Sequence, residues 1–236
     1  MAENILSSYI SGSYEKEKLP RIKTGLVVTI SRQKGAGAFP IAKMIIDKLH
    51  QLRYPLGKVV KWKMISKEIL EESATKLKVA PKKVDTILER QSKNLFDELL
   101  LSFSEKALPN DFKIKNTIKN VIETAADEGN IIIVGRGGAC ITRERENSFH
   151  IRLMAPYKWR VNRIMKVENM GIYEAEQLVK QRDQQREGLK KYYLGDRKIE
   201  ELYDMVINVS TMKDSEIADA IFSVIKQRQD DLMQRH

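Results

Sequence analysis

The sequence predicts an α/β fold, in which a five-stranded parallel β-sheet is covered by helices on both faces. Short apolar segments alternate along the 236 residues with longer segments of helical periodicity, a pattern that is typical of parallel sheets. The segments 26–30 and 131–134 are almost continuously apolar, as expected for strands buried on both faces. The length suffices for one sizeable α/β domain or two small ones.

The N-terminal half begins with a polar, mixed stretch over residues 1–23, which we expect to be an extension that precedes a domain over 24–236. The first strand, 26–30, leads through a loop into a helix over about 39–51. The elements expected next are a strand at 59–62, a helix over 66–77 with Ser66 as its N-cap, and a longer helix that starts near Pro81 and ends before Pro109.

The C-terminal half continues the alternation of strands and helices. Glycines and prolines mark most of the expected boundaries. The expected elements are a helix over 114–128, strands at 131–134 and 149–154, helices over 156–168 and 173–193, a last strand at 205–209 and a last helix over 215–229.

The composition limits the classes of partner. A formal charge of +10 favours anionic partners but does not choose among nucleotides, nucleic acid and acidic lipid. Scattered basic residues and an aromatic content of 7% argue against a dedicated nucleic-acid binder. No apolar run approaches the roughly 18 residues of a membrane helix. A single cysteine, Cys140, and the lack of a signal-peptide pattern indicate a cytoplasmic protein.

The loop after the first strand is a candidate anion site. A strand that leads through small residues into a helix N-terminus brings backbone N–H groups and the positive end of the helix dipole together. Against the phosphate-loop template G-x-x-x-x-G-K-[ST], only Gly37 fits, because Arg32, Ala38 and Phe39 occupy the other three positions. Spacing alone therefore allows an ordinary αβ turn equally well. The residues concerned are Ser31, Arg32, Gln33, Lys34, Gly35, Ala36, Gly37 and Ala38.

A second candidate site follows the strand at 131–134. Arg136 stands in a turn with glycine at 135, 137 and 138, and a guanidinium held there suits bidentate binding of a phosphate. An ion pair at the sheet edge is the alternative. Because loops that follow parallel strands open along the same edge, we expect this turn to lie beside the loop 31–38.

The long charged helix carries a third set of basic residues. Arg182, Arg186 and Lys190 are four residues apart, so they form one stripe that could close over a polyphosphate as a lid. Asp183 could orient an arginine or accept from a ribose hydroxyl. Arg160 and Arg163 lie one turn apart on the preceding helix. For both sets, a solvated surface is the ordinary alternative.

Other chemistries find little support. The three histidines have no cysteine or carboxylate at metal-ligand spacing, so we expect no metal site built by the protein alone. Cys140 has no evident partner base, and we interpret it as a packing residue. The glycines near Arg136 do not have the spacing of a dinucleotide-binding fingerprint.

Six segments in matching order resemble the cytidylate kinase-like family, a branch of the nucleoside monophosphate kinases within the P-loop NTPases. They are residues 28–37, 65–72, 132–138 and 153–165, the pair Asp183 and Arg186, and residues 203–208. The resemblance covers about 25–228. It implies a three-layer α/β/α fold, a helical acceptor-binding insert over 58–112, a helical lid over 171–197, nucleotides as ligands, and ATP with Mg²⁺.

The resemblance also implies roles for the basic residues. The loop 32–38 would hold the donor phosphates, Arg136 the acceptor phosphate, and Arg182, Asp183 and Arg186 would begin the lid motif. Arg160 and Arg163 match the basic helix that precedes the lid, and Lys190 lies in the lid region. The chain departs from the family at the loop lysine and hydroxyl, replaced by Ala38 and Phe39, and at two aspartates, replaced by Gly137 and Ser66.

The expected function is transfer of the γ-phosphoryl group of ATP to a nucleoside monophosphate, CMP or dCMP first, or to a similar acceptor. Lys34 or Arg32 is the hypothetical substitute for the missing loop lysine, so Lys34 joins Arg136, Arg182 and Arg186 among the candidate catalytic residues. The alternative is a kinase-like module that binds a nucleotide or another anion without catalysis. A nucleic-acid-binding protein is a weaker alternative that charge alone supports.

Overall fold

The computed structural model describes residues 25–53, 60–66, 112–195 and 200–234. Its centre is a parallel sheet of five strands in the order β2-β3-β1-β4-β5. The strands are β1 (Val27–Arg32), β2 (Lys63–Ile65), β3 (Ile131–Val134), β4 (Ser148–Met154) and β5 (Met205–Asn208). The predicted fold class, a five-stranded parallel sheet between helical layers, is confirmed.

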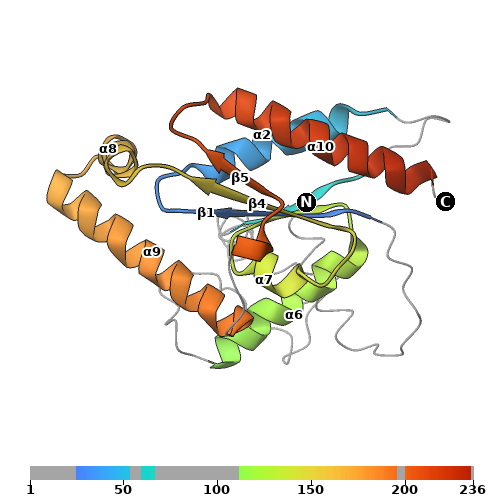
Figure 1. Ribbon diagram of the computed structural model, residues 1–236, viewed down its shortest axis with the longest axis horizontal. Helices are drawn as coiled ribbons and strands as arrows, with labels where there is room; N and C mark the ends of the chain where they lie inside the picture. The colour runs from blue at the N-terminus through green and yellow to red at the C-terminus, as the bar shows by residue number, and fades with distance from the viewer. Residues whose placement is uncertain (1–24, 54–59, 67–111, 196–199, 235–236) are drawn as a thin grey trace, which may run out of the picture.

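Helices cover both faces of the sheet (Figure 1). Helices α2 (Ala38–Gln51) and α10 (Asp214–Gln234) pack side by side on one face, and α6 (Phe112–Glu128) and the short α7 (Gly138–Thr142) lie on the other. Helices α8 (Tyr157–Glu168) and α9 (Ile172–Leu194) form a hairpin beyond one end of the sheet. A 3₁₀ turn, η2 (Glu200–Leu202), precedes β5.

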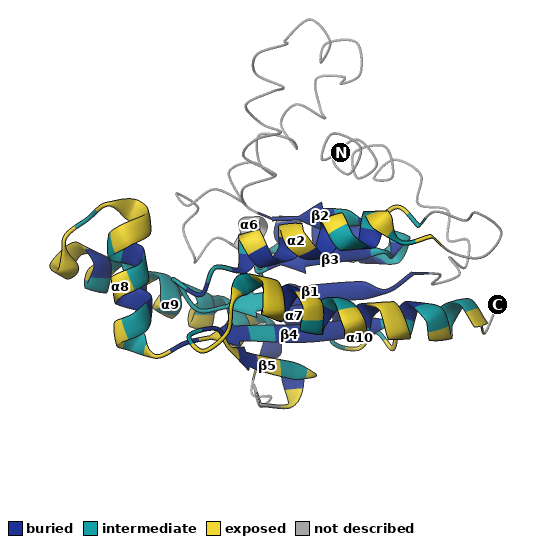
Figure 2. Ribbon diagram, turned by 90° about the horizontal axis from the view of Figure 1, so that it is seen from above, coloured by how far each residue is buried: buried dark blue, intermediate teal, exposed yellow. Residues whose placement is uncertain are grey.

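Alternating side chains of the central strands fill two cores, which explains why β3 is wholly apolar and β1 is largely so. Val28 and Ile30 point toward α2 and α10, where they join the large buried cluster. Thr29 and Ile133 point to the opposite face, where their methyl groups pack against Gly138 at the start of α7. Figure 2 shows the central strands β1, β3 and β4 as the most deeply buried part of the sheet, whereas the edge strand β5 is largely exposed. A strand with two buried faces cannot alternate between apolar and polar residues.

Two elements differ from the sequence prediction. The second strand is Lys63–Ile65 rather than 59–62, because pairing with β3 begins where the Lys63 N–H donates to the Asn130 carbonyl (2.9 Å). Trp62 from the predicted strand is buried but lies before the ladder. Helix α7 was not predicted, since its five residues are too short to show a helical period.

The other described helices and strands lie within a few residues of their expected positions, except that α10 extends to Gln234, and the 3₁₀ turn η2 was not predicted either. Several predicted features lie outside the described residues. They are the extension over 1–23, the helix over 66–77 apart from Ser66, and the helix from Pro81. Of the predicted insert over 58–112, the structure describes only residues 60–66 and the start of α6. Within the part of the chain that is described, no helix combines the length and the apolarity needed to cross a bilayer.

Candidate functional site

The loops that follow β1 and β3 meet at one edge of the sheet, as parallel strand order requires. The Gly135 N–H donates to the Ile30 carbonyl (3.0 Å). The guanidinium of Arg32 lies against Gly135, where an added Cβ would come within 1.6 Å of Arg32 Nη1. Gly135 also has a φ of 78°, which other residues rarely adopt. Glycine is therefore needed at 135 for the Arg32 guanidinium to lie between the two loops.

The loop 32–38 is tied to β4 by its own polar groups. The Gln33 N–H donates to the Leu153 carbonyl (3.2 Å), and the Gln33 side-chain oxygen accepts from the Ala155 N–H (3.1 Å). The Ala36 N–H closes a tight turn onto the Gln33 carbonyl (3.2 Å). Gly37, with φ 72°, then begins α2. The first amides of α2 have no partner within the helix, so the positive end of α2 points at this loop.

Arg160 acts as a buried clamp, by which we mean that its guanidinium ties the loop 32–38 to Ala155 and to Asp183. Its residue exposure is only 5%. Its Nε donates to the Ala155 carbonyl (3.0 Å), and its Nη1 donates to the Lys34 carbonyl (3.0 Å) and to Asp183 Oδ2 (2.5 Å). The alternative of a solvated surface does not hold for Arg160, because its guanidinium donates to two backbone carbonyls and a carboxylate.

Asp183 connects the long helix α9 to the loop. Besides Arg160, it accepts the Lys34 N–H at Oδ1 (2.7 Å) and lies 3.6 Å from Arg186 Nη1. One of the two predicted roles, orientation of an arginine, matches this geometry. The contact spans 149 positions of sequence, which explains why the sequence could indicate the residue but not its partners.

Arg186 lies at the centre of a cationic cluster formed by Arg32, Arg160, Arg182 and Arg186. Its Nη1 donates to the Arg32 carbonyl (3.4 Å). Burial first, then the charge of Arg32 and, to a smaller extent, those of Arg182 and Arg160 together lower the pKa of Arg186 to about 9, against the opposing effect of Asp183. The guanidiniums thus repel one another, and an anion placed among them would relieve that repulsion. The Arg186 side chain is 30% exposed, so it combines its place in the cluster with access to solvent.

Two lysines of the predicted site are paired elsewhere. The Lys34 ammonium binds Glu168 at the end of α8 (3.0 Å), so its charge is directed away from the cationic cluster. Lys190 binds Glu187 (2.5 Å) on its own helix. Arg182 donates to the Gln185 side chain (3.0 Å). The stripe predicted on α9 therefore divides, with Arg186 on the loop and Lys190 in a local ion pair.

Arg163 and Arg136 lie beside the two glycine turns. The guanidinium of Arg163 is so close to Gly37 that an added Cβ would be 2.5 Å from its Nη2. It also lies over the Trp159 ring (5.3 Å) and pairs with Asp214 (3.4 Å). Arg136 adopts a φ of 56° in a left-handed turn that it shares with Gly135 and Gly137. Such a conformation in a non-glycine residue is often kept for function.

The resemblance found in the sequence implies ATP and Mg²⁺, and the described residues fit the two unequally. The cationic cluster and the start of α2 suit a polyphosphate. A Mg²⁺ held by the protein fits poorly, because Phe39 replaces the hydroxyl residue of the phosphate-loop template. The nearby carboxylates of Glu168, Asp183 and Asp214 each bind a basic side chain. No cluster of metal-ligating side chains occurs among the described residues.

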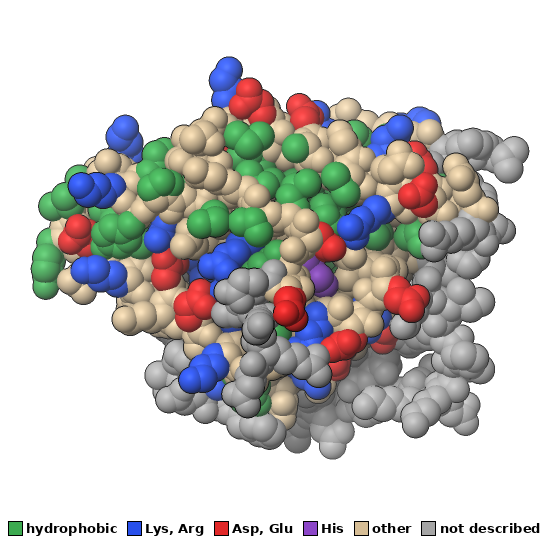
Figure 3. Space-filling view, in the orientation of Figure 1, with side chains coloured by type: hydrophobic (Ala, Val, Ile, Leu, Met, Phe, Trp, Pro, Cys, Tyr) green, Lys and Arg blue, Asp and Glu red, His purple; other side chains and the backbone are tan. Residues whose placement is uncertain are grey.

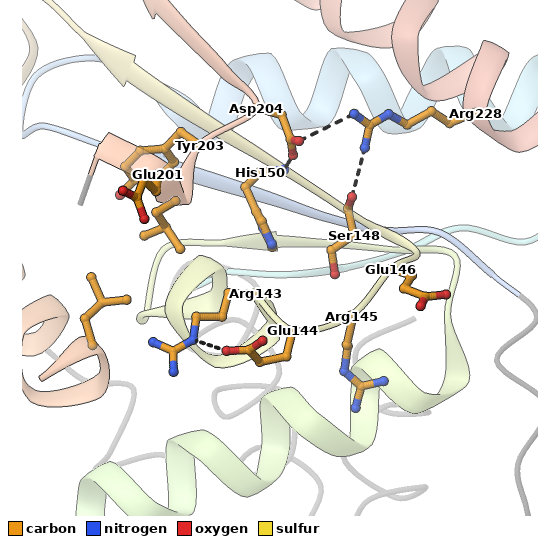
Figure 4. A pocket seen from close by; sticks show the side chains of 12 residues that line it. Arg143, Glu144, Arg145, Glu146, Ser148, His150, Glu201, Tyr203, Asp204 and Arg228 are labelled. Atoms are coloured by element: carbon orange, nitrogen blue, oxygen red, sulfur yellow. Dashed lines mark hydrogen bonds and ion pairs between the residues drawn. The ribbon is translucent and has the colours of Figure 1, made fainter. Parts of the chain in front are cut away.

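A separate pocket of about 450 Å³ lies near the amino end of β4, away from the loop edge (Figure 4). The buried His150 points into it and bonds Thr29 Oγ1 through Nδ1 (2.8 Å). Burial lowers the pKa of His150, so its neutral form is favoured. None of the predicted site residues lines this pocket. From the sequence, we examined His150 only as a possible metal ligand. No local sequence pattern indicates that it would line a pocket.

Cys140 is a buried, free cysteine. Burial raises the pKa of Cys140 to about 11, which disfavours the reactive thiolate and agrees with its interpretation as a packing residue. On the face that Figure 3 shows, basic and acidic side chains are interspersed and do not form one basic tract.

The family assignment follows from residues 27–211, which match the model of the cytidylate kinase-like family. The chain belongs to this family. A search among curated proteins found no match. The resemblance inferred from the six ordered segments is therefore confirmed at the level of the family. Membership supports a kinase-like fold and, as a general function, nucleotide binding.

Two solved structures illustrate how far the fold similarity extends. An uncharacterized protein from Eubacterium ventriosum superposes with a TM-score of 0.56 at 20% identity, over 86% of this chain and 98% of its own. The protein TT1252 from Thermus thermophilus gives a TM-score of 0.42 at 14% identity, over 87% of this chain and 98% of its own. The first similarity supports the fold alone, and the second is too low to support any conclusion.

Proposed function

We propose that this cytidylate kinase-like protein is a phosphotransferase that moves the γ-phosphoryl group of ATP to a nucleoside monophosphate. The observation that carries the proposal is the convergence of Arg32, Arg160, Arg182 and Arg186 at the loop edge of the sheet, with Asp183 as the opposing charge. Such an excess of cationic charge suits a polyphosphate. The preference for CMP or dCMP rests on the family.

The missing loop lysine has a structural substitute in this proposal. The template lysine would stand at Ala38, but the guanidinium of Arg163 reaches the same turn from α8. Arg32 supplies a second cation beside Gly135. Both differ from the ammonium of Lys34, which is bound to Glu168. We therefore assign the donor phosphates to Arg32, Arg163 and the first amides of α2, and we remove Lys34 from the catalytic set.

The chemical step requires positioning and charge neutralisation. An oxygen of the acceptor phosphate attacks the γ-phosphorus, the bond to the β–γ bridging oxygen breaks, and ADP leaves with the electron pair. The acceptor phosphate is already ionised, so no general base is needed. Arg136, in its glycine turn, would hold the acceptor, and Arg186 would lie between acceptor and donor. The protein forms no covalent intermediate.

The second candidate function is a nucleotide- or anion-binding module without turnover. Two observations favour it, namely Ala38 and Phe39 in the loop and the carboxylate of Asp183 on the Lys34 N–H. Loss of one preorganised donor typically slows an enzyme by about 10²–10³. A fold that binds phosphate could therefore persist after catalysis had become negligible.

Calorimetry with ATP and CMP, each with and without Mg²⁺, and an assay of ADP release over the four nucleoside monophosphates separate the two candidates. We expect ADP release, and the comparison with and without Mg²⁺ tests whether turnover needs an ion that the described residues are poorly suited to hold. Arg186→Gln should weaken ATP binding by about 10- to 100-fold, because a hydrogen bond to a charged group contributes about 1.5–3 kcal/mol. Lys180→Gln removes the same charge from an exposed position of α9 and should change the affinity less than threefold.

Each result of these measurements has a defined meaning. Binding of ATP without ADP release under any condition would favour the binding module over the enzyme. Equal affinities of the two variants would show that only net charge matters, and the proposed site would then be wrong.

A further inference from the structure

The carboxylate of Asp183 binds the groups that a phosphate at the loop would need. Its two oxygens accept from the Lys34 N–H (2.7 Å) and from Arg160 Nη1 (2.5 Å), and Oδ1 lies 3.6 Å from Arg186 Nη1. A backbone amide of a phosphate loop and two guanidiniums form a donor set that is typical of a bound phosphate. An anion of the protein itself occupies part of the anion site.

We infer that Asp183 is a built-in competitor of the phosphate ligand, and that polyphosphate binding displaces it from the loop. The inference rests on the proposed function, since it takes the loop 32–38 as the phosphate site. An N–H group bonds one strong acceptor at a time, so a phosphate oxygen at the Lys34 amide must replace Asp183 Oδ1. The carboxylate also repels an incoming phosphate for as long as it stays there.

The attachment of α9 permits such an exchange. The buried side chains of α9 are Ala175, Val179 and Leu194. The first two pack on α8 in an apolar cluster, and Leu194 belongs to a second cluster near α7. Residues 180–193 between these anchors carry no fully buried side chain and contact the loop through Asp183 and Arg186. Polar contacts can be exchanged for a ligand without opening an apolar core.

The opposite role for Asp183 makes the opposite prediction. If Asp183 serves to hold the loop in a shape that binds phosphate, its removal disorders the site and weakens binding. If it competes, its neutralisation weakens its bonds to two donors and removes a repelling charge, so binding becomes tighter.

The test is calorimetric titration of inorganic tripolyphosphate, without Mg²⁺, into the full chain and two variants. Asp183→Asn keeps the size of the side chain and removes its charge. Glu187→Gln makes the same change in charge one turn further along α9, where the 52% exposed Glu187 side chain binds Lys190 and Arg152. We expect Asp183→Asn to tighten binding about tenfold or more, which is about 1.4 kcal/mol, and Glu187→Gln to stay within about twofold because exposed charges are screened.

The outcomes separate this inference from the proposed function. Equal tightening in the two variants, or weaker binding in Asp183→Asn, would overturn the competitor role while tripolyphosphate binding by the unchanged chain still supports the site. If none of the three proteins binds tripolyphosphate, the phosphate site itself is wrong, and the inference falls with it.

A second measurement uses the unchanged protein, so it does not depend on the folding of a variant. Hydrogen exchange of residues 180–193 is followed by mass spectrometry with and without saturating tripolyphosphate. Polyphosphate replaces the two loop contacts of Asp183, while Arg186 stays at the loop on the phosphate, so exchange around Asp183 should become faster. Slower exchange there, as expected if Asp183 keeps its contacts while α9 closes further on the ligand, would contradict the inference.

Discussion

Replacement of Arg160 by methionine tests whether the candidate site is built around a buried clamp. Methionine retains much of the length of the side chain and removes all of its donors. The change leaves the carbonyls of Lys34 and Ala155 without their guanidinium donor. It also leaves Asp183 without its closest cation.

The expected loss of stability can be worked from these contacts. Removing one partner of a buried ion pair typically costs about 3–5 kcal/mol. The Asp183 side chain is 25% exposed and keeps the Lys34 N–H and Arg186, so the cost should be smaller. We expect Arg160→Met to lower the free energy of unfolding by about 2–4 kcal/mol. At about 2–4 °C for each kcal/mol in a chain of this size, the Tm should fall by about 4–16 °C.

The assay is urea unfolding at pH 7 followed by circular dichroism, with Arg163→Met as the matched control. Arg163 has one long ion pair, to Asp214 at 3.4 Å, and its side chain is 26% exposed, so its loss should cost less than about 1 kcal/mol. The variant Asp183→Asn should show coupling to Arg160→Met of about 1–3 kcal/mol in a double-mutant cycle. Equal losses for the two methionine variants, or additivity with Asp183→Asn, would refute the clamp.

Three further variants test other parts of the structure. Gly135→Ala should push the Arg32 guanidinium out of the crevice and weaken ATP binding severalfold in calorimetry, because its Cβ would meet Arg32 Nη1 at 1.6 Å. Gly188→Ala, with open space around the added Cβ, should leave binding unchanged and stabilise α9 by up to about 1 kcal/mol. The folded pKa of His150 lies below its unfolded value near 6.5, so below that pH the unfolded chain binds the proton more readily. Stability should therefore fall with pH from about 6.5 down through the folded pKa, by at most about 1.4 kcal/mol per pH unit from this group. Unfolding of His150→Asn at pH 7.5 and 5.5 should show a smaller difference than the unchanged chain, and an equal difference would contradict this account.

The fold was predictable because its signals are local. Buried strands such as Ile131–Val134 can be recognised from their apolar composition. The alternation of strands and helices then leaves few possible orders and directions of the strands in the sheet. The strand at 63–65 was displaced in the prediction because only three residues pair with β3, and which three is decided by the register with Ile131 rather than by local propensity.

The site was less predictable because its contacts are not local. Residue types identified the basic positions, but burial of Arg160 depends on a carboxylate from α9 and a carbonyl from the loop, 23 and 126 positions away. From the sequence alone, either Lys34 or Arg32 could replace the loop lysine. The position of Glu168 separates them, because it attracts the Lys34 ammonium and leaves the Arg32 guanidinium in the crevice.

The loop after β1 has lost the positive side chain that phosphate loops usually carry, yet positive charge has not left the site. Besides Arg32 of the loop itself, it comes from Arg163 on α8 and Arg186 on α9, and the loop keeps its amides and its glycine turn. A cation fixed inside a loop binds phosphate whatever the rest of the chain does. Cations carried by the α8–α9 hairpin bind it only when that hairpin lies over the loop. In this protein, phosphate affinity should therefore depend on the position of α9, and Asp183 is the residue on α9 that links that position to the loop.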